Sequence, residues 1–269
     1  MPVGHAWELT RRMPHPALRG AVVEYQGFRE RVTGTLCRRE IPAVGITVII
    51  NLGPALGVDG TRRSDSFVAG LCTSPSLVET IGEMEVLEAR LTPLGARRLF
   101  GVPMSEIAER VVALDDLVGR EGRAAVARLR AAPTWAERFA LLDRALLARL
   151  GHAPATPPPV DYAWQRLAER HGLVSMEALA KELVWSPKRL VTTFRDQVGL
   201  GPKQVARLFR FQRAVKAMSQ ARIRLTAIAF DMGYYDQAHL IREVRALSGL
   251  APGELMRQMH PDGPGIIEQ

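Results

Sequence analysis

The sequence predicts an α+β protein, in which a β-barrel or sandwich with trailing helices precedes an all-α region. Three observations support this fold class. Short β-branched runs broken by Gly and Pro fill residues 20–91, a proline-rich segment covers residues 151–160, and helical periodicity dominates the remainder of the chain. A length of 269 residues also favours two domains over one.

The N-terminal part changes its pattern at Thr92. Residues 46–50 and 86–91 are β-branched or apolar runs, which are typical of short strands. Thr92 can cap a helix that has Pro93 in its first turn, and residues 135–150 repeat apolar side chains at helical spacing. We therefore expect strands to about residue 91 and helices from there to residue 150.

Residues 151–160, with the sequence GHAPATPPPV, contain four prolines and no charged side chain. Consecutive prolines hold an extended, semi-rigid backbone and cannot continue a helix. We expect this segment to be a linker between an N-terminal domain of residues 1–150 and a C-terminal domain of residues 161–269.

The charge of the chain favours a polyanionic partner. The net charge is +8 and the pI is about 10.2, values that suit nucleic acid or an anionic membrane surface. From Val160 onward 16 Lys and Arg stand against 11 Asp and Glu, and the first 159 residues carry 20 against 17. The sequence contains no leader-like N-terminal segment and no apolar stretch of about 18 residues. We expect a cytoplasmic protein without a membrane partner.

The helical part contains an internal repeat. The segment ALAKELVW-SPKRLVTTFRDQVGLGP, from Ala178, matches AIAFDMGYYDQAHLIREVRALSGLAP, from Ala227, with one residue gained in the turn. Each copy predicts a short helix, a tight turn and a longer helix, which is the geometry of a helix-turn-helix. The two units are expected at about residues 176–199 and 226–249.

Helix start and stop signals agree with the repeat. Ser175 can cap the first helix, and Ser186 precedes a proline at the first position of the second. Asp236 can cap the corresponding helix of the second unit. Gly199 and Gly249 then end the two longer helices.

The segment between the units supports a role in DNA binding. Residues 203–219 predict a helix of roughly 25 Å at 1.5 Å per residue. Such a helix could hold two recognition helices about one turn of B-DNA apart, near 34 Å. The alternative, a helical scaffold for protein interactions, uses the same apolar pattern but does not require this spacing.

The stretch TAIAFDMGYYDQAHLIREVRALSGLAPGEL, from Thr226, resembles the second-unit signature of AraC/XylS transcription regulators. The resemblance covers roughly 90 residues. It implies a double helix-turn-helix domain that binds double-stranded DNA, RNA polymerase as a partner, and an N-terminal sensor or dimerisation domain, often a cupin-like β-barrel followed by helices. Two residues depart from the pattern: Val184 stands where the family has glycine, and Val244 where the second unit has phenylalanine.

The N-terminal turns of a recognition helix enter the major groove, so exposed positions there can contact bases. The candidate DNA-binding residues of the two units are Lys188, Arg189, Val191, Thr192 and Arg195, and Gln237, Ala238, Ile241, Arg242 and Arg245. The resemblance assigns base reading in the first unit to Lys188, Val191 and Thr192. In the second unit the matching region contains Gln237, Ala238, Ile241 and Arg242. Any one of these cations taken alone is equally well explained as a solvated surface side chain.

The N-terminal domain has two compatible interpretations. A barrel could hold a small-molecule effector, or the domain could form a homodimer through an apolar helix face. That face would contain Phe139, Leu142, Leu146 and Leu150.

An enzyme or DNA-repair protein with a helix-turn-helix appendage is the competing class. The six histidines are dispersed, so neither a catalytic cupin metal nor another metal is expected. Cys37 and Cys72 lack an activating neighbour, and a disulfide between them is an open alternative to two reduced thiols. No GxSxG motif or phosphate-binding loop is present. We expect no catalytic residues and no cofactor.

Overall fold

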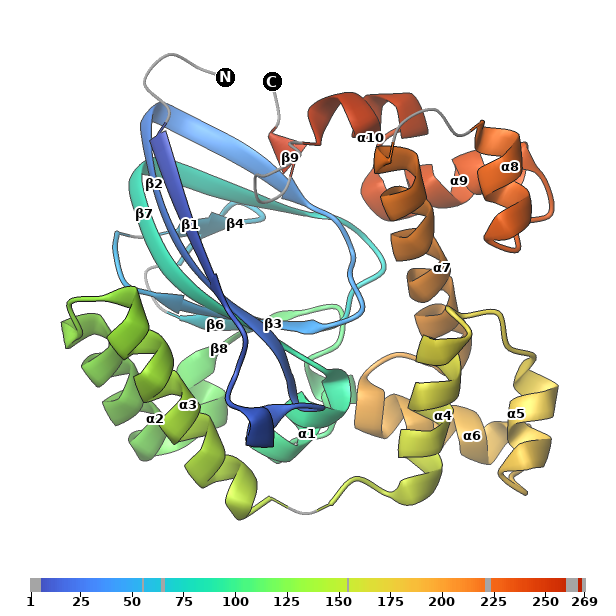
Figure 1. Cartoon of the computed structure of the whole chain (residues 1–269), viewed down its shortest axis with the longest axis horizontal. Helices are drawn as coiled ribbons and strands as arrows, with labels where there is room; N and C mark the ends of the chain where they lie inside the picture. Colours follow the sequence, from blue (N-terminus) through green and yellow to red (C-terminus); the bar gives the residue numbers. More distant parts are fainter. Residues whose placement is uncertain are drawn as a thin grey trace.

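The computed structural model describes residues 6–54, 56–63, 66–153, 155–220, 224–259 and 266–267. A curved antiparallel sheet with helices on one side forms the N-terminal half, and helices with the short strand β9 form the C-terminal half, which is therefore not purely helical as predicted (Figure 1). The predicted α+β class is confirmed. A continuous cluster of buried side chains runs through both halves, so the helical half packs against the sheet-containing half.

The sheet has the order β1-β2-β7-β3-β6-β8, with β4 beside β7, β5 beside β4 and β9 beside β2. Neighbouring strands pair in antiparallel fashion throughout. The strands are β1 (Ala6–Arg12), β2 (Val22–Glu40), β3 (Ile46–Asn51), β4 (Leu56–Val58), β5 (Thr61–Arg63), β6 (Phe67–Ala69), β7 (Ser76–Leu91), β8 (Val111–Ala113) and β9 (Ile266–Ile267).

Two strands are much longer than the short runs that the sequence predicts. Strand β2 has 19 residues and β7 has 16, and they pair along most of their length. Their outward positions carry charges such as Arg29, which forms an ion pair with Glu85 on the neighbouring strand. Because the apolar residues alternate with these paired charges, the sequence contains no long β-branched run over either strand.

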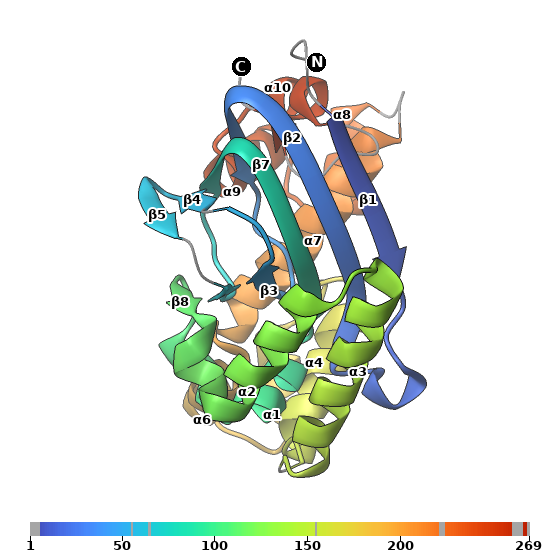
Figure 2. The same ribbon diagram turned by 90° about the vertical axis from the view of Figure 1, so that its left-hand side faces the viewer.

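Helices α1 (Pro93–Phe100), α2 (Leu114–Ala131) and α3 (Trp135–Gly151) follow the main strands, with short 3₁₀ turns η1 (Pro16–Leu18) and η2 (Met104–Glu106). The predicted cap is confirmed, since the Thr92 hydroxyl accepts a hydrogen bond of 3.0 Å from the Gly95 N–H. The expectation that strands stop at residue 91 is wrong, because β8 pairs with β6 after the first helix. Figure 2 shows α2 and α3 side by side against the sheet.

The apolar face of α3, which the sequence offers as a dimer interface, points into the protein instead. Phe139 and Leu142 are buried, and the Phe139 ring stacks on Tyr25 with 5.9 Å between ring centroids. The Tyr25 hydroxyl donates a hydrogen bond of 2.9 Å to the buried carboxylate of Asp143 on the same helix. Leu146 and Leu150 are half-buried against this core, so the helix face is already used within the chain.

The C-terminal half consists of α4 (Pro158–Glu169), α5 (Met176–Glu182), α6 (Pro187–Val198), α7 (Pro202–Ser219), α8 (Leu225–Asp231), α9 (Gln237–Ser248) and α10 (Pro252–Gln258). The proline-rich segment, residues 151–160, overlaps both neighbouring helices, because Gly151 ends α3 and Pro158 begins α4, where the first turn tolerates proline. Pro154 lies outside the described residues, as do residues 1–5. Within the described ranges, no helix combines the length and apolar character needed to cross a membrane.

Candidate nucleic-acid interface

The first helix of the first unit, α5, ends in a Schellman turn. The Trp185 N–H donates to the Ala180 carbonyl at 2.9 Å, and the Val184 N–H donates to the Lys181 carbonyl at 3.1 Å. This turn requires a left-handed backbone at its penultimate position, and Val184 adopts it with a φ of 54°. A β-branched residue in this region is strained, and the Val184 side chain is 89% exposed, so packing does not compensate.

The first helix of the second unit, α8, ends in the same way. The Tyr234 N–H donates to the Ala229 carbonyl at 2.9 Å, and the Gly233 N–H donates to the Phe230 carbonyl at 3.1 Å. Gly233 takes the left-handed conformation with a φ of 72° at no steric cost. The two copies of the repeat therefore fold into the same helix-turn-helix geometry.

Each recognition helix begins with the predicted cap. The Ser186 hydroxyl accepts a hydrogen bond of 3.2 Å from the Arg189 N–H at the start of α6. The Asp236 carboxylate accepts one of 2.6 Å from the His239 N–H at the start of α9. The His239 ring is used structurally, because its Nδ1 accepts a hydrogen bond from the Tyr235 N–H at 3.3 Å. These caps fix the first turns, from which bases would be read.

All five candidate residues of the first unit lie on exposed positions of α6. They are Lys188, Arg189, Val191, Thr192 and Arg195. The opposite face of the helix is buried and contains Leu190, Phe194 and Val198. The amphipathic division thus leaves the candidate side chains free to meet a partner.

Two of these side chains also make contacts within the first unit. The Thr192 hydroxyl donates to the Lys188 carbonyl at 3.0 Å, which leaves its methyl group and its lone pairs facing outward. The Arg189 guanidinium lies 4.8 Å from the centroid of the Trp185 ring. This aromatic partner was not identified from the sequence. A tryptophan four residues before an arginine is nevertheless a pattern that can indicate a cation–π contact.

In the second unit four of the five candidates are exposed on α9, namely Gln237, Ala238, Arg242 and Arg245. Ile241 is half-buried, so only part of its side chain is accessible. The buried face of the helix carries Leu240, Val244 and Leu247. Val244 fills the core position that Phe194 occupies in the first unit.

Helix α7 connects the two units. Its 18 residues span roughly 27 Å at 1.5 Å per residue. The Arg207 Nε donates a hydrogen bond of 2.6 Å to the Glu243 carboxylate of α9, and this ion pair is partly exposed. Arg207 therefore links the connecting helix to the second recognition helix.

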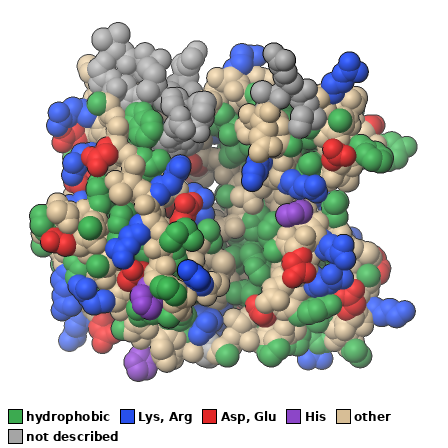
Figure 3. Space-filling view, in the orientation of Figure 1, with side chains coloured by type: hydrophobic (Ala, Val, Ile, Leu, Met, Phe, Trp, Pro, Cys, Tyr) green, Lys and Arg blue, Asp and Glu red, His purple; other side chains and the backbone are tan. Residues whose placement is uncertain are grey.

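Acidic side chains near the first unit are already engaged. Hydrogen bonds from Arg166 and then Tyr162 lower the pKa of Glu182, so this carboxylate stays ionised and paired. A hydrogen bond from Ser175 likewise lowers the pKa of Glu177. Lys and Arg side chains spread over both halves of the face in Figure 3, in agreement with the charge counts of the two halves.

The N-terminal half contacts both recognition helices at their C-terminal ends. Helix α6 packs against η2 and α1, and a Cβ on Gly199 would lie 3.1 Å from the Met104 carbonyl oxygen. A Cβ on Gly249, which ends α9, would lie 2.7 Å from a guanidinium nitrogen of Arg39. Strand β9, which follows α10, pairs with β2. The ends that contact the sheet domain are opposite to the ends that carry the candidate base-reading residues.

The chemistry of the cysteines weighs against a nucleophilic role. Neither Cys37 nor Cys72 forms a disulfide, so the disulfide alternative is wrong. Burial, with the nearby Glu109 carboxylate, raises the pKa of the Cys72 thiol to about 11, so little thiolate forms near neutral pH. Among the described residues no three His, Cys, Asp or Glu side chains gather as metal ligands; His5 and His260 lie outside those residues.

Comparisons with known proteins agree with this geometry. Residues 179–258 match the family model described as a helix-turn-helix domain, and residues 10–113 match a domain of unknown function, DUF6597. No curated protein sequence matches the chain.

Several solved structures are similar to the chain. A ToxT variant from Vibrio cholerae is 8% identical, with 88% of this chain and 98% of that chain covered and a TM-score of 0.47. Wild-type ToxT with a bound unsaturated fatty acid is 7% identical, with coverages of 91% and 96% and a TM-score of 0.46. The C-terminal domain of AraT, a response regulator from Geobacillus stearothermophilus, is 19% identical, with coverages of 40% and 91% and a TM-score of 0.37.

Proposed function

We propose that the protein is a sequence-specific, DNA-binding transcription regulator of the AraC/XylS type, because residues 179–258 match a helix-turn-helix domain model. In this proposal α6 and α9 enter successive major-groove segments on one face of the duplex. The observation that carries it is the repeated unit: two identical turns, two capped recognition helices and two exposed N-terminal faces on either side of α7.

Base reading is assigned to the exposed first turns. Lys188 and Arg242 carry donors that suit guanine O6 and N7, and Gln237 suits adenine. Val191 and the Thr192 methyl group can pack on a thymine methyl, whereas Arg195 and Arg245, one turn later, are placed to meet phosphates.

The remaining candidates have smaller parts in this interface. Arg189, held over Trp185, is placed at the backbone edge of the groove. Ala238 and Ile241 offer apolar surface near the bases, and Ile241 does so only with its exposed part.

The proposal divides the chain into a control domain, residues 1–150, and a DNA-binding domain, residues 161–269, with residues 151–160 between them. The control domain would respond to a small-molecule effector or to homodimerisation, and RNA polymerase is the expected partner of the DNA-bound protein. Support for control comes from the contacts of the sheet domain with the ends of both recognition helices, because a change there would alter their relative placement.

Selection of bound sequences from a random duplex library tests the function. The full chain is used at fixed, near-physiological salt, since electrostatic affinity depends steeply on salt. The expected result is a motif with two elements about one helical turn apart. A motif with a single element would contradict the use of both units, and no enrichment at all would leave the paired helices as an interaction scaffold.

A further inference from the structure

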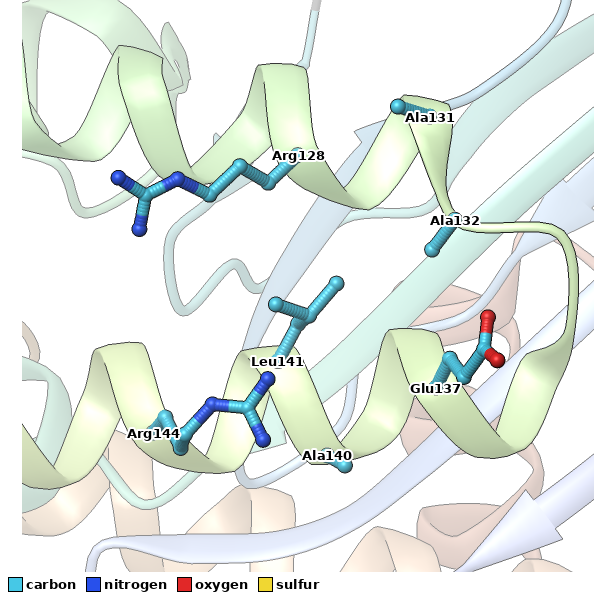
Figure 4. Close-up of a pocket in the computed structure, with 7 residues that line it drawn as sticks. All are labelled: Arg128, Ala131, Ala132, Glu137, Ala140, Leu141 and Arg144. Carbon is cyan, nitrogen blue, oxygen red and sulfur yellow. The ribbon is translucent and has the colours of Figure 1, made fainter.

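A groove lies between α2 and α3 near the turn that joins them (Figure 4). In Figure 1 these two helices lie on the left of the molecule, whereas α6 and α9 lie on the right. Its volume is about 420 Å³, and the groove is open to solvent rather than enclosed. The apolar part of the lining is formed by Ala132, Ala140 and Leu141, and the polar part by Arg128, Arg144 and Glu137.

Among the described residues, the two arginines at the groove are unpaired, as are Arg120 and Arg123 of α2, whereas other arginines of these helices have partners. Arg130 donates to the Asn51 carbonyl at 3.0 Å, and Arg138 donates to the Glu85 carboxylate at 2.6 Å. Arg128 and Arg144 are exposed, and neither has a hydrogen bond or ion pair among the described residues. Two positive groups therefore border one groove, and neither is paired with Glu137, the carboxylate that also lines it.

The side chains are arranged along the groove by polarity. In Figure 4 the guanidinium groups of Arg128 and Arg144 lie on one side of Leu141, while the Glu137 carboxylate lies on the other. An anionic group placed between two guanidinium groups reduces their mutual repulsion and can accept paired hydrogen bonds from each. The opposite end, next to Glu137, disfavours a second negative charge.

From this arrangement we propose that the α2–α3 groove binds a small organic acid with one negative charge and an apolar body. The carboxylate contacts Arg128 and Arg144, and the body covers Leu141, Ala140 and Ala132. The volume holds a molecule with a single ring or a short branched chain, and the exposed rim leaves a path for entry.

The two helices that form the groove are linked to the first recognition helix through Arg149 and α1, although Arg149 itself does not line the groove. Arg149 of α3 donates to the Leu117 and Val118 carbonyls of α2, at 2.9 and 3.0 Å, beside the kink at Gly119. The same guanidinium also donates to the Leu99 carbonyl of α1, and α1 packs against α6. A ligand that changes the separation of α2 and α3 therefore acts on a helix that supports α6. This regulatory part, unlike the binding itself, rests on the proposed function.

The experiment is a titration of the isotope-labelled full chain, followed by the side-chain Nε–H NMR signals of its arginines. The probe is cyclohexanecarboxylate, compared at constant ionic strength with the neutral cyclohexanecarboxamide and with inorganic phosphate. We expect saturable shifts of the Arg128 and Arg144 signals with the carboxylate alone. Equal binding of the amide or of phosphate, or no saturable shift with the carboxylate, would overturn the proposal.

Substitutions locate the site. The double variant Arg128→Gln and Arg144→Gln is expected to weaken carboxylate binding at least tenfold. The matched control, Arg120→Gln with Arg123→Gln, removes two exposed arginines of α2 outside the groove and should leave binding unchanged. Ala140→Glu, which places a carboxylate one helical turn before Arg144, should also abolish binding. Binding that survives both groove variants would disprove the site.

DNA binding is measured separately on the same samples. Groove binding without any selected DNA motif would keep the ligand site and remove its regulatory role. A selected motif without groove binding would keep the regulator and reject the site.

Discussion

The two helix-turn-helix units share one hydrogen-bond pattern in their turns, but different residues adopt the left-handed conformation that this pattern requires. The second unit places Gly233 at the left-handed position of the turn, and the first unit places Val184 there. Both backbones adopt the same geometry, because the Schellman hydrogen bonds and the packing of the helix pair fix it. The comparison teaches that the turn is imposed by the unit as a whole, and that the first unit retains local strain.

The units also differ in their cores and in their attachment to the rest of the protein. Phe194 fills the first core, whereas the smaller Val244 occupies the same position of the second. The first unit packs through α6 against η2 and α1, and the second meets Arg39 and is followed by β9 on strand β2. We therefore expect equivalent substitutions in the two units to have unequal effects.

The largest expected difference concerns the cores. Phe194→Ala removes a fully buried ring and should lower the free energy of unfolding by about 3–5 kcal/mol. Val244→Ala removes two methyl groups and should cost about 2 kcal/mol. Denaturant unfolding of the full chain measures both, and equal losses would show that the second core is as tightly packed as the first.

Base reading by the two units can be separated. Lys188→Ala and Arg242→Ala should each weaken specific binding by about 1–3 kcal/mol, and each should relax specificity in only its own element of the selected motif. Binding to the selected duplex and to half-mutated duplexes, at one salt concentration, measures this. A uniform loss on all duplexes would instead identify the residue as a phosphate contact.

An exchange at the turns tests the strain. Gly233→Val should destabilise the protein by about 1–2 kcal/mol, because its Cβ meets Leu173 and its φ is positive. Val184→Gly should stabilise it by about 0.5–1 kcal/mol, since the relief of strain exceeds the added backbone entropy of the unfolded chain. Thermal unfolding of both variants provides the check, and a loss of stability in Val184→Gly would contradict the strain argument.

The smallest expected effect concerns the ion pair between α7 and α9. Arg207→Gln should cost at most about 1 kcal/mol, with a loss that shrinks at high salt. In a double-mutant cycle with Glu243→Gln, the coupling should be of the same size. Thr193, which corresponds to Glu243 in the first unit, carries no charge, so an Arg207 coupling to that position should be absent.

Much of the candidate interface could be predicted from the sequence because its determinants are local. The caps at Ser186 and Asp236, the glycines that end both recognition helices, and the exposed positions along α6 and α9 all follow from short-range patterns. The stacking of Arg189 on Trp185 and the pairing of Arg207 with Glu243 were missed, since they depend on side-chain placement across a turn or between helices.

The sheet could be predicted only in outline. Strand partners lie far apart in the chain, as β2 with β7 and with β9 show, and the paired charges on β2 and β7 hide the length of both strands. The inward orientation of Phe139 also depended on a distant partner, Tyr25. A helical pattern shows that one face is apolar, but it does not show which surface covers that face.

By itself, therefore, the sequence determined the fold class, the repeat, the ends of the helices and the set of exposed candidate side chains, because helix formation and capping depend on residues within one or two turns. The tertiary structure alone decided the strand pairing, the use of the α3 face, the contacts of the sheet domain with Gly199 and Gly249, and the groove between α2 and α3. These features arise from contacts between residues far apart in the chain, and such contacts form only when the elements pack together.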